Sequence, residues 1–392
     1  MKERKNFKYL AGILVFIMVI QYISILIPFI NVKAAQTTTD GNGTTWSYVI
    51  DNEGNATNVI WESGDVVFDN KIQFPAVLDG HNVISIGNGL SNAIPNSANW
   101  TNSQDIEVTF PSGIKEIKAS AFAFSCRTSN GSNEVNGNVE KISKVNIPNT
   151  LEKIGDNAFK GCSKLININI PQAVTSIGNN AFLYCKKLEE INVDSNNTTY
   201  SSDEGVLYNL EKNTLYKYPE GKTSSKYVVP ESVTYLSANS MLCENPTVII
   251  FLKERGNMSL GGLNIFNENV TVKCFENINL YGYLQSNNIP CELLVKIVCQ
   301  DNNFYNKLKS VASEYVAKAD DSNLQLILEN EITELDISGS NIKKINGIEK
   351  LDKLTRLNAS NNLIEDVSPV ENMNITDLNL KNQTVRNKST KK

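Results

Sequence analysis

Apolar residues recur at a fixed interval of 23 residues in the middle of the chain. Eight positions between Leu151 and Ile170 hold the same or a similar residue 23 positions later. The first set is Ile154, Gly155, Ala158, Phe159, Cys162, Leu165, Ile168 and Ile170, and the second is Ile177, Gly178, Ala181, Phe182, Cys185, Leu188, Ile191 and Val193. A fixed period of this length is typical of stacked units, none of which can bury its apolar face alone. The pattern therefore predicts a solenoid.

Within one repeat, the spacing of apolar residues predicts a strand followed by a tight turn. Ile168 and Ile170 alternate as in a strand, and Pro171 ends it because proline has no N–H for the next ladder bond. An Ala-Phe-x-x-Cys segment then fits a single helical or 3-10 turn that places the phenyl ring inside the coil. We expect a repeat solenoid of mainly β structure with short helical or 3-10 turns. Its predicted core residues are Phe122, Phe159, Phe182, Cys162 and Cys185.

The repeat consensus I-G-x-x-A-F-x-x-C-x-x-L-x-x-I-x-I-P resembles the BspA-type leucine-rich repeat of bacterial surface proteins, over about residues 46–293. Three further parts of the chain resemble an N-terminal hairpin, a hairpin insertion and a closing unit of that family. They are residues 46–50 with 59–61, residues 205–208 with 215–219, and residues 270–274 with 288–290. The chain departs from the consensus at Ser240-Met241 and around Asn88, where no Ala-Phe turn occurs, so we expect irregular packing there.

A second repeat, with a shorter interval of 22 residues, follows near the C-terminus. Its apolar positions are Ile332, Leu335, Ile337, Ile342, Ile345 and Ile348, then Leu354, Leu357, Ala359, Ile364, Val367 and Val370. A partial third coil begins at Ile375. These segments resemble internalin-type leucine-rich repeats, and the resemblance places Asn362 where a side chain satisfies loop backbone groups, with Ser340 and Gln383 at the same position of the flanking coils.

Between the two repeats, apolar residues at helical spacing behind Asp301 predict an amphipathic helix over residues 301–318. The internalin resemblance implies that this helix covers the first coil of the second array; a free linker helix is the alternative. We therefore expect two leucine-rich-repeat arrays joined by a helical cap. The expected segments are a signal peptide (1–34), a linker (35–45), BspA-type repeats (46–293), a helical cap or linker (294–331), internalin-type repeats (332–385) and a tail (386–392).

The N-terminus has the layout of a secretory signal, with four basic residues before an apolar run over residues 9–30. We predict cleavage after Ala34; an uncleaved anchor is the alternative, because the run is long enough to cross a bilayer. Either way the rest of the chain is exported, to the cell surface or the medium. Removal of residues 1–34 takes away five basic residues and one acidic residue, which changes the net charge from −5 to −9. An acidic chain disfavours nucleic acid as a partner, and a membrane contact is expected only through this segment.

Candidate catalytic and metal-binding chemistry is sparse. The chain has seven cysteines and one histidine, without CxxC or zinc-finger spacing. We interpret Cys162 and Cys185 as small core residues, with a disulfide between them as the alternative. His81 lies in a predicted turn, and the carboxylate pairs Glu189-Glu190 and Asp203-Glu204 fit a solvated face better than a glycosidase site. We expect no enzymatic activity, no cofactor and no metal.

The outward positions of the strands predict one continuous binding face, since stacking aligns them. In the first array these residues are Ser143, Lys144, Asn146, Asn167, Asn169, Glu189, Glu190 and Asn192. In the second they are Thr333, Glu334, Asp336, Thr355, Arg356, Asn358, Thr376, Asp377 and Asn379. A solvated sheet without a partner is the alternative, because the set holds no aromatic residue. Two insertions, residues 88–104 and 127–138, are expected to form loops at one edge, with Trp100 as a candidate contact.

Both resemblances imply an exported interaction module, adhesin-like, that binds a protein or glycoprotein of host or matrix origin. One alternative is a truncated fragment, or a structural surface-layer component of a larger wall-associated protein. No LPxTG-type sorting signal or closing cap is visible in the sequence. A less favoured alternative is the targeting part of an extracellular enzyme, for which no residue block remains to form a catalytic domain.

Overall fold

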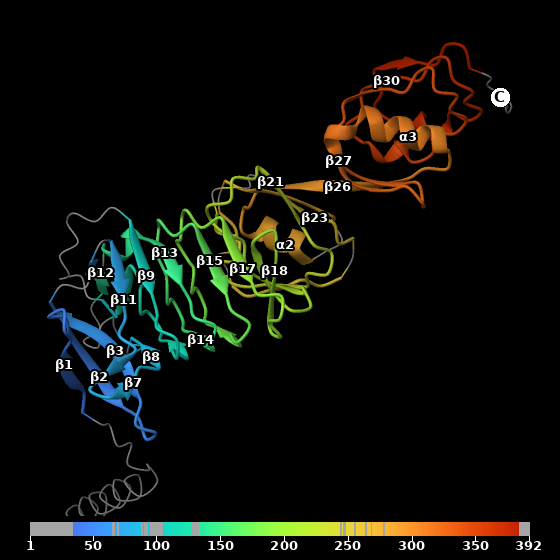
Figure 1. The fold of residues 1–392 in the computed structure, drawn as a ribbon. Coiled ribbons are helices and arrows are strands. Elements are labelled where there is room, and N and C mark those ends of the chain that lie inside the picture. The colour runs from blue at the N-terminus through green and yellow to red at the C-terminus, as the bar shows by residue number, and fades with distance from the viewer. Residues whose placement is uncertain are drawn as a thin grey trace, which may run out of the picture.

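A computed structural model describes residues 34–383, apart from gaps at 65–66, 69, 88, 90–92, 95–104, 128–132, 136, 244, 246–247, 255, 263–264, 268 and 277–278. The predicted signal segment, up to residue 33, and Trp100 lie outside the described residues. The chain winds as a stack of coils from the blue end of Figure 1 to a separate orange and red block near the C-terminus. The prediction of a mainly β solenoid is confirmed.

Each coil of the stack contributes one strand to each of two walls. The first wall contains β8 (Ser85–Ile86), β10 (Glu116–Ile117), β14 (Lys153–Ile154) and β16 (Ser176–Ile177), all parallel. The second wall contains β5 (Lys71–Gln73), β9 (Ile106–Thr109), β13 (Ile142–Asn146), β15 (Asn167–Ile170) and β17 (Glu190–Val193). Ile154 pairs with Ile177 in the first wall, and Ile168 pairs with Ile191 in the second. The 23-residue offset in the sequence is therefore the register between neighbouring coils.

An antiparallel hairpin closes the N-terminal end of the first wall. It consists of β2 (Thr45–Ile50) and β3 (Ala56–Ser63), as predicted, and Val59 of β3 pairs with Ile86 of β8. Trp46, Tyr48 and Trp61 fill its inner side. An additional strand, β1 (Gln36–Thr39), pairs with β2 inside the segment expected to be a linker.

Three short antiparallel strand pairs lie near this end. They are β4 (Val67–Phe68) against β5, β6 (Val77–Leu78) against β7 (His81–Asn82), and β11 (Ser125–Arg127) against β12 (Asn133–Val135). The insertion expected to be an irregular loop over residues 127–138 therefore contains half of a hairpin and leads into η1 (Val139–Lys141), a 3-10 turn.

A column of phenylalanines occupies the centre of the coils. Phe159 lies between Phe122 and Phe182, with ring centroids 5.5 and 6.0 Å away and interplanar angles of 5° and 3°. All three rings are buried, as are Cys162 and Cys185. The Cys162 thiol donates to the carbonyl oxygen of Phe122 at 3.5 Å, and Cys185 donates to that of Phe159 at 3.2 Å. Both cysteines are free thiols, so the core packs without the alternative disulfide.

The regular stacking is interrupted after β17 by an inserted antiparallel hairpin. Its strands are β18 (Tyr200–Asp203), β19 (Val206–Asn209) and β20 (Thr214–Lys217), which continue in parallel as β22 (Tyr235–Leu236) and β24 (Ser259–Leu260). The hairpin formed by residues 205–208 and 215–219 is thus where the sequence predicts it. On the other wall, β21 (Lys226–Val229), β23 (Val248–Phe251) and β25 (Thr271–Cys274) are parallel, and α2 (Asn279–Ser286) follows β25.

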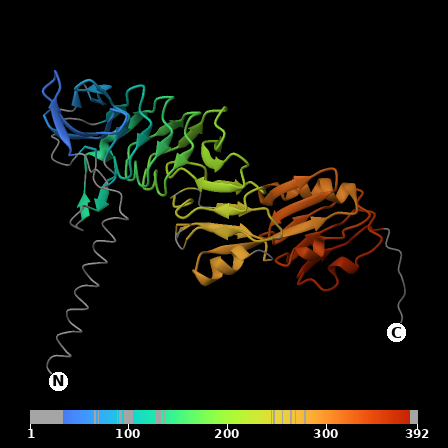
Figure 2. The same ribbon diagram turned by 90° about the horizontal axis from the view of Figure 1, so that it is seen from below.

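One long strand, β26 (Cys291–Val298), joins the solenoid to the C-terminal block. It pairs in parallel with β25 through residues 291–293 and antiparallel with β28 (Gln325–Glu329), which also pairs with β27 (Val316–Asp320). The boundary expected between residues 293 and 294 falls inside this strand. Figure 2 shows the yellow and orange strands running side by side into the red block.

A buried ion cluster reinforces this junction. The Glu329 carboxylate on β28 accepts hydrogen bonds from Lys226 and, at 2.7 Å, from Lys273, which also binds Glu292 at 2.7 Å. Glu329 is only 8% exposed, and burial opposes ionisation, but the hydrogen bonds from the two lysines prevail and lower the pKa of its carboxyl group.

The predicted helix after Asp301 is present but shorter than expected. It is α3 (Asn302–Val311), followed by η2 (Ser313–Tyr315), and residues 316–320 form β27 instead of continuing the helix. The Asp301 carboxylate accepts from the backbone N–H groups of Asn303 and Phe304, as an N-cap does, and from that of Lys343. Phe304, Tyr305 and Leu308 of α3 pack in one core with the apolar residues of the first C-terminal coil. The helix therefore covers this coil.

The C-terminal block ends in a parallel sheet of β29 (Glu334–Asp336), β30 (Arg356–Asn358) and β31 (Asp377–Asn379). Leu335, Leu357 and Leu378 pair in register. Two 3-10 turns, η3 (Ile348–Lys350) and η4 (Ser368–Val370), form the opposite side of the coils.

The Asn362 side chain is the main polar element inside this block. Its amide oxygen accepts from the backbone N–H groups of Ser340 and Ile342, and its amide nitrogen donates to the carbonyls of Ile337 and Ala359. Gln383 repeats part of this pattern by accepting from Ile364 N–H at 3.0 Å. Asn362 is 2% exposed, so it satisfies backbone groups that water cannot reach.

Candidate functional site

The outward residues of the second wall form the first part of the predicted face. Asn167 and Asn169 of β15 are exposed, and their neighbours Ile168 and Ile170 are buried. The same alternation leaves the other predicted residues partly or fully open to solvent. Lys144, Glu189 and Glu190 are exposed, whereas Ser143, Asn146 and Asn192 are half-buried. This face lies along β13, β15 and β17 in Figure 1.

A glutamate that the sequence did not single out organises the polar groups of this wall. Glu107 on β9 accepts a hydrogen bond from Lys144 at 2.9 Å and another from Asn146. These bonds, the one from Lys144 first, lower the pKa of the Glu107 carboxyl group. The pairing of β9 with β13, 37 residues apart, places Glu107 opposite Lys144 and Thr109 opposite Asn146. The Val108-Thr109-Phe110-Pro111 segment carries this register in the sequence, but an insertion separates it from the regular repeats.

The outward residues of the C-terminal sheet form the second part of the face. Most of these side chains are exposed, and Asn358 and Asn379 are half-buried. Seven residues are exposed: Thr333, Glu334, Asp336, Thr355, Arg356, Thr376 and Asp377. Leu378 is 43% exposed, although its counterpart Leu357 is buried, because β31 is the edge strand of the described sheet.

Residues of all three C-terminal strands line one hollow with a cavity volume of 580 Å³. Val311 at the end of α3 and the edges of Leu335 and Leu357 supply its apolar part. Its polar part consists of Glu334, Asp336, Arg356, Asn358, Asp377 and Asn379, all of which belong to the predicted set. The sequence thus identified the outward residues of this hollow, but not the contribution of α3.

The charges in this hollow are arranged in rows across the strands. Arg356 forms an ion pair with Glu334, which raises the pKa of the guanidinium group. Asn358 donates to Asp336 at 3.0 Å. Hydrogen bonds from Ser338 lower the pKa of the Asp336 carboxyl group, so that it stays ionised at neutral pH. With Asp377, three carboxylates face one guanidinium group, so the hollow is acidic.

The described residues offer little catalytic chemistry. Burial raises the pKa of the Cys162 and Cys185 thiols, Cys185 to about 12, so neither is a thiolate at neutral pH. The His81 Nδ1 atom lies 2.7 Å from the carbonyl oxygen of Gly54, and the nearby Asp79 carboxylate accepts hydrogen bonds from Tyr48 and Thr38. No group of three His, Cys, Asp or Glu side chains in the described parts of the chain is placed to bind a metal ion.

The described segments also contain no helix with the length and apolar character needed to cross a membrane. The apolar run over residues 9–30 lies outside them.

Part of the solenoid is similar in sequence to a known family of repeats. Residues 128–232 match the BspA type leucine rich repeat region in six copies. This segment lies inside the range expected from the sequence and includes the coils of the phenylalanine column from Phe159 onward. No curated protein matches the chain.

Several solved structures are similar to the solenoid. A leucine-rich repeat protein from Eubacterium ventriosum is 20% identical with a TM-score of 0.35, over 62% of this chain and 67% of that one. A leucine rich cell surface protein from Faecalibacterium prausnitzii is 19% identical with a TM-score of 0.31, over 61% and 76%. The pneumococcal vaccine antigen PcpA is 17% identical with a TM-score of 0.34, over 62% and 73%. With scores this low, the fold assignment rests on the repeats and the sheets of the chain itself.

Proposed function

We propose that this protein is an exported, non-enzymatic repeat protein that binds another protein through the outward face of its strands. The BspA-type repeats support the general class, since repeat solenoids present extended surfaces for partners. The observation that carries the proposal is the hollow on the C-terminal sheet. It collects acidic side chains from β29 and β31 around an apolar floor, a combination that recognises a basic side chain flanked by apolar ones.

The organisation proposed for this purpose is two arrays joined by a helical cap. Two features support the internalin-like character of the second array: the helix that covers its first coil, and the Asn362 hydrogen bonds to loop backbone groups. In this arrangement the second-wall face and the C-terminal hollow are separate contact areas of one chain. The partner is a protein or glycoprotein of host or matrix origin, which makes the protein adhesin-like.

Binding is tested with the purified secreted chain immobilised against host-cell and matrix extracts, followed by titration of each captured protein in pure form. The double variant Asp336→Lys, Asp377→Lys reverses two charges of the hollow. We expect this double variant to bind the partner more weakly, with a dissociation constant raised roughly tenfold or more. The control Glu365→Lys, Glu371→Lys makes the same charge change at exposed positions outside the hollow and leaves affinity unchanged. A saturable partner that binds both double variants equally well contradicts the proposed surface.

Export is tested separately, by N-terminal sequencing of the protein recovered outside the cell. The expected N-terminus is Ala35, directly after the proposed cleavage position. Recovery of a chain that begins at Met1 contradicts cleavage, and retention of the chain in the cytoplasm contradicts export.

A further inference from the structure

A hollow of 350 Å³ lies where the inserted hairpin interrupts the solenoid. The first wall ends at β16, and β20 belongs to a different sheet of order β18-β19-β20-β22-β24, so the two strands are not paired with each other. The turn at residues 178–183 forms one side of the hollow, and β20 and β22 form the other. The volume falls within the range of about 300 to 1,000 Å³ that is typical of small-molecule sites.

Two tyrosine rings form one side of this hollow. Tyr216 on β20 and Tyr235 on β22, two neighbouring parallel strands, are each 37% exposed. Tyr200 packs against the Tyr216 ring edge-to-face, with centroids 5.5 Å apart, and its hydroxyl accepts from Ile177 N–H at the edge of β16. Tyr200 therefore fixes the position of the Tyr216 ring, which remains partly exposed and lines the hollow.

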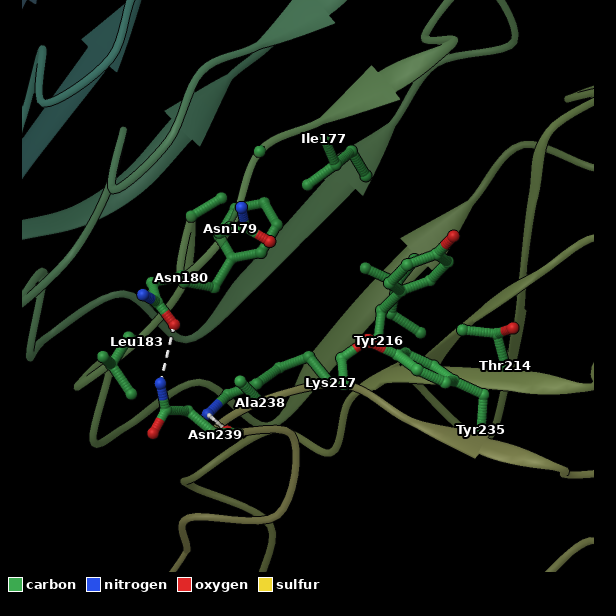
Figure 3. A pocket seen from close by; sticks show the side chains of 15 residues that line it. Ile177, Asn179, Asn180, Leu183, Thr214, Tyr216, Lys217, Tyr235, Ala238 and Asn239 are labelled. Atoms are coloured by element: carbon green, nitrogen blue, oxygen red, sulfur yellow. Dashed lines mark hydrogen bonds between the residues drawn. The ribbon is translucent and has the colours of Figure 1, made fainter. Parts of the chain in front are cut away.

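Side-chain amides face the tyrosines from the opposite side, as Figure 3 shows. The Asn239 amide nitrogen donates to the Asn180 amide oxygen at 2.8 Å and ties the two coils together. Asn179 is exposed, and its side chain has no hydrogen-bond partner among the described residues. Its amide group can therefore donate and accept at the same time toward a ligand.

The hollow carries no free charge on the side chains that line it. Lys217 is the one charged residue among its described lining residues. Its ammonium group is 2.7 Å from the Glu220 carboxylate, and both side chains are only 8% exposed. An ionic ligand would gain no unpaired counter-charge here, and a neutral ligand loses no ion pair on entry.

We propose that this hollow binds a neutral sugar unit of an oligosaccharide. A pyranose ring has an apolar face of C–H groups, which packs on an aromatic ring, and a rim of hydroxyl groups, each of which both donates and accepts. The Tyr216 and Tyr235 rings match the face, and the Asn179 amide and the tyrosine hydroxyls match the rim. The absence of free charge on the lining side chains selects against acidic sugars and charged peptides.

This inference goes beyond the protein-binding function proposed above. The hollow is lined from β16, β20 and β22, whereas the proposed protein contacts lie on the second wall and the C-terminal sheet. Variants of one surface leave the other unchanged, so each proposal can fail without the other.

The test uses the full chain with three neutral trisaccharides, maltotriose, cellotriose and triacetylchitotriose, and with trigalacturonic acid, in which every sugar unit carries a carboxylate. Saturation-transfer NMR detects contact, and calorimetry gives the dissociation constant. At least one neutral trisaccharide is expected to bind saturably below about 10 mM, and more tightly than trigalacturonic acid. The proposal is overturned if none of the neutral sugars binds, or if trigalacturonic acid binds the same site equally well.

Variants then locate the site. Tyr216→Ala and Tyr235→Ala are expected to weaken binding by roughly tenfold, because each removes one aromatic face, whereas Tyr216→Phe keeps the face and most of the affinity. Tyr184→Ala is the matched control, since Tyr184 is 50% exposed and lies outside this hollow. Asn179→Ala removes an exposed side chain that makes no hydrogen bond to the described residues, so it is expected to preserve folding and must still weaken binding. Full affinity in Asn179→Ala and in both tyrosine-to-alanine variants refutes the assignment.

Discussion

Replacing one ring of the phenylalanine column should lower the free energy of unfolding by an amount that can be worked out from the structure. Phe159 is fully buried, and its ring is stacked between two parallel rings 5.5 and 6.0 Å away. Replacing a buried phenylalanine with alanine costs about 3 to 5 kcal/mol of unfolding free energy. The loss of two aromatic stacks, each worth about 0.5 to 1.5 kcal/mol, places Phe159→Ala near the upper end of that range.

Phe182→Ala provides an internal comparison. Phe182 is also buried but has one stacked ring neighbour among the described contacts, so its loss is expected to be smaller by about 1 kcal/mol. Urea unfolding followed by tryptophan fluorescence reports on this core directly, because Trp46 and Trp61 belong to the same buried cluster as Phe159.

The control for both variants is Tyr184→Ala, which removes an exposed ring and is expected to change the unfolding free energy by no more than about 0.5 kcal/mol. A cost below about 1.5 kcal/mol for Phe159→Ala, or a cost equal to that of the control, refutes the argument that the column carries the packing of the coils.

Three further predictions concern the C-terminal block. Asn362→Ala removes the side-chain partner of the Ser340 and Ile342 N–H groups and of the Ile337 carbonyl and is expected to cost about 3 kcal/mol, measured by faster amide exchange over residues 337–364, whereas Ser340→Ala has little effect. Asp301→Ala removes the N-cap of α3 and costs about 1 kcal/mol, and unchanged exchange over residues 302–311 would contradict the capping role. The Glu329 carboxyl group has a lowered pKa in the folded state, so its contribution to stability is present above its ordinary pKa and is lost as the pH falls through the folded value. Unfolding midpoints measured from pH 7 to pH 3 should therefore fall more steeply for the native protein than for Glu329→Gln, and equal slopes would count against this role.

The repeat period predicted the coils well because it reflects a physical register. Each core residue stacks on its counterpart in the next coil, so a residue such as Ile154 must recur as Ile177 for the layer to close. The outward residues follow from the same register, since strand side chains alternate. This is why Asn167 and Asp336 are exposed as predicted.

Other elements depend on partners that the sequence does not place nearby. Val311 and Tyr315 fit the helical spacing after Asp301, but α3 ends at Val311 because residues 316–320 pair with β28. The strand β1 has no apolar alternation and exists through its pairing with β2. A short apolar pair, Leu280 and Leu284, marks α2 at helical spacing, and this signal could have been found.

The tyrosine-lined hollow could not be predicted, because it is the space left by an interruption. Tyr216 and Asn179 lie 37 residues apart and face each other only because the inserted hairpin prevents β16 and β20 from pairing. A periodic pattern identifies the residues that stack from coil to coil. It carries no information on the hollow that forms where the stacking of coils is interrupted.

The shared strand β26 has a consequence for how the protein would meet a large partner. One strand is hydrogen-bonded to both the solenoid sheet and the C-terminal hairpin, so no flexible linker separates the two proposed contact areas. Under the proposed function, a partner bound at one area would reach the other without a search through linker conformations, which raises the effective concentration for the second contact. The proposal therefore predicts tighter binding of partners whose two epitopes match the distance between the two areas.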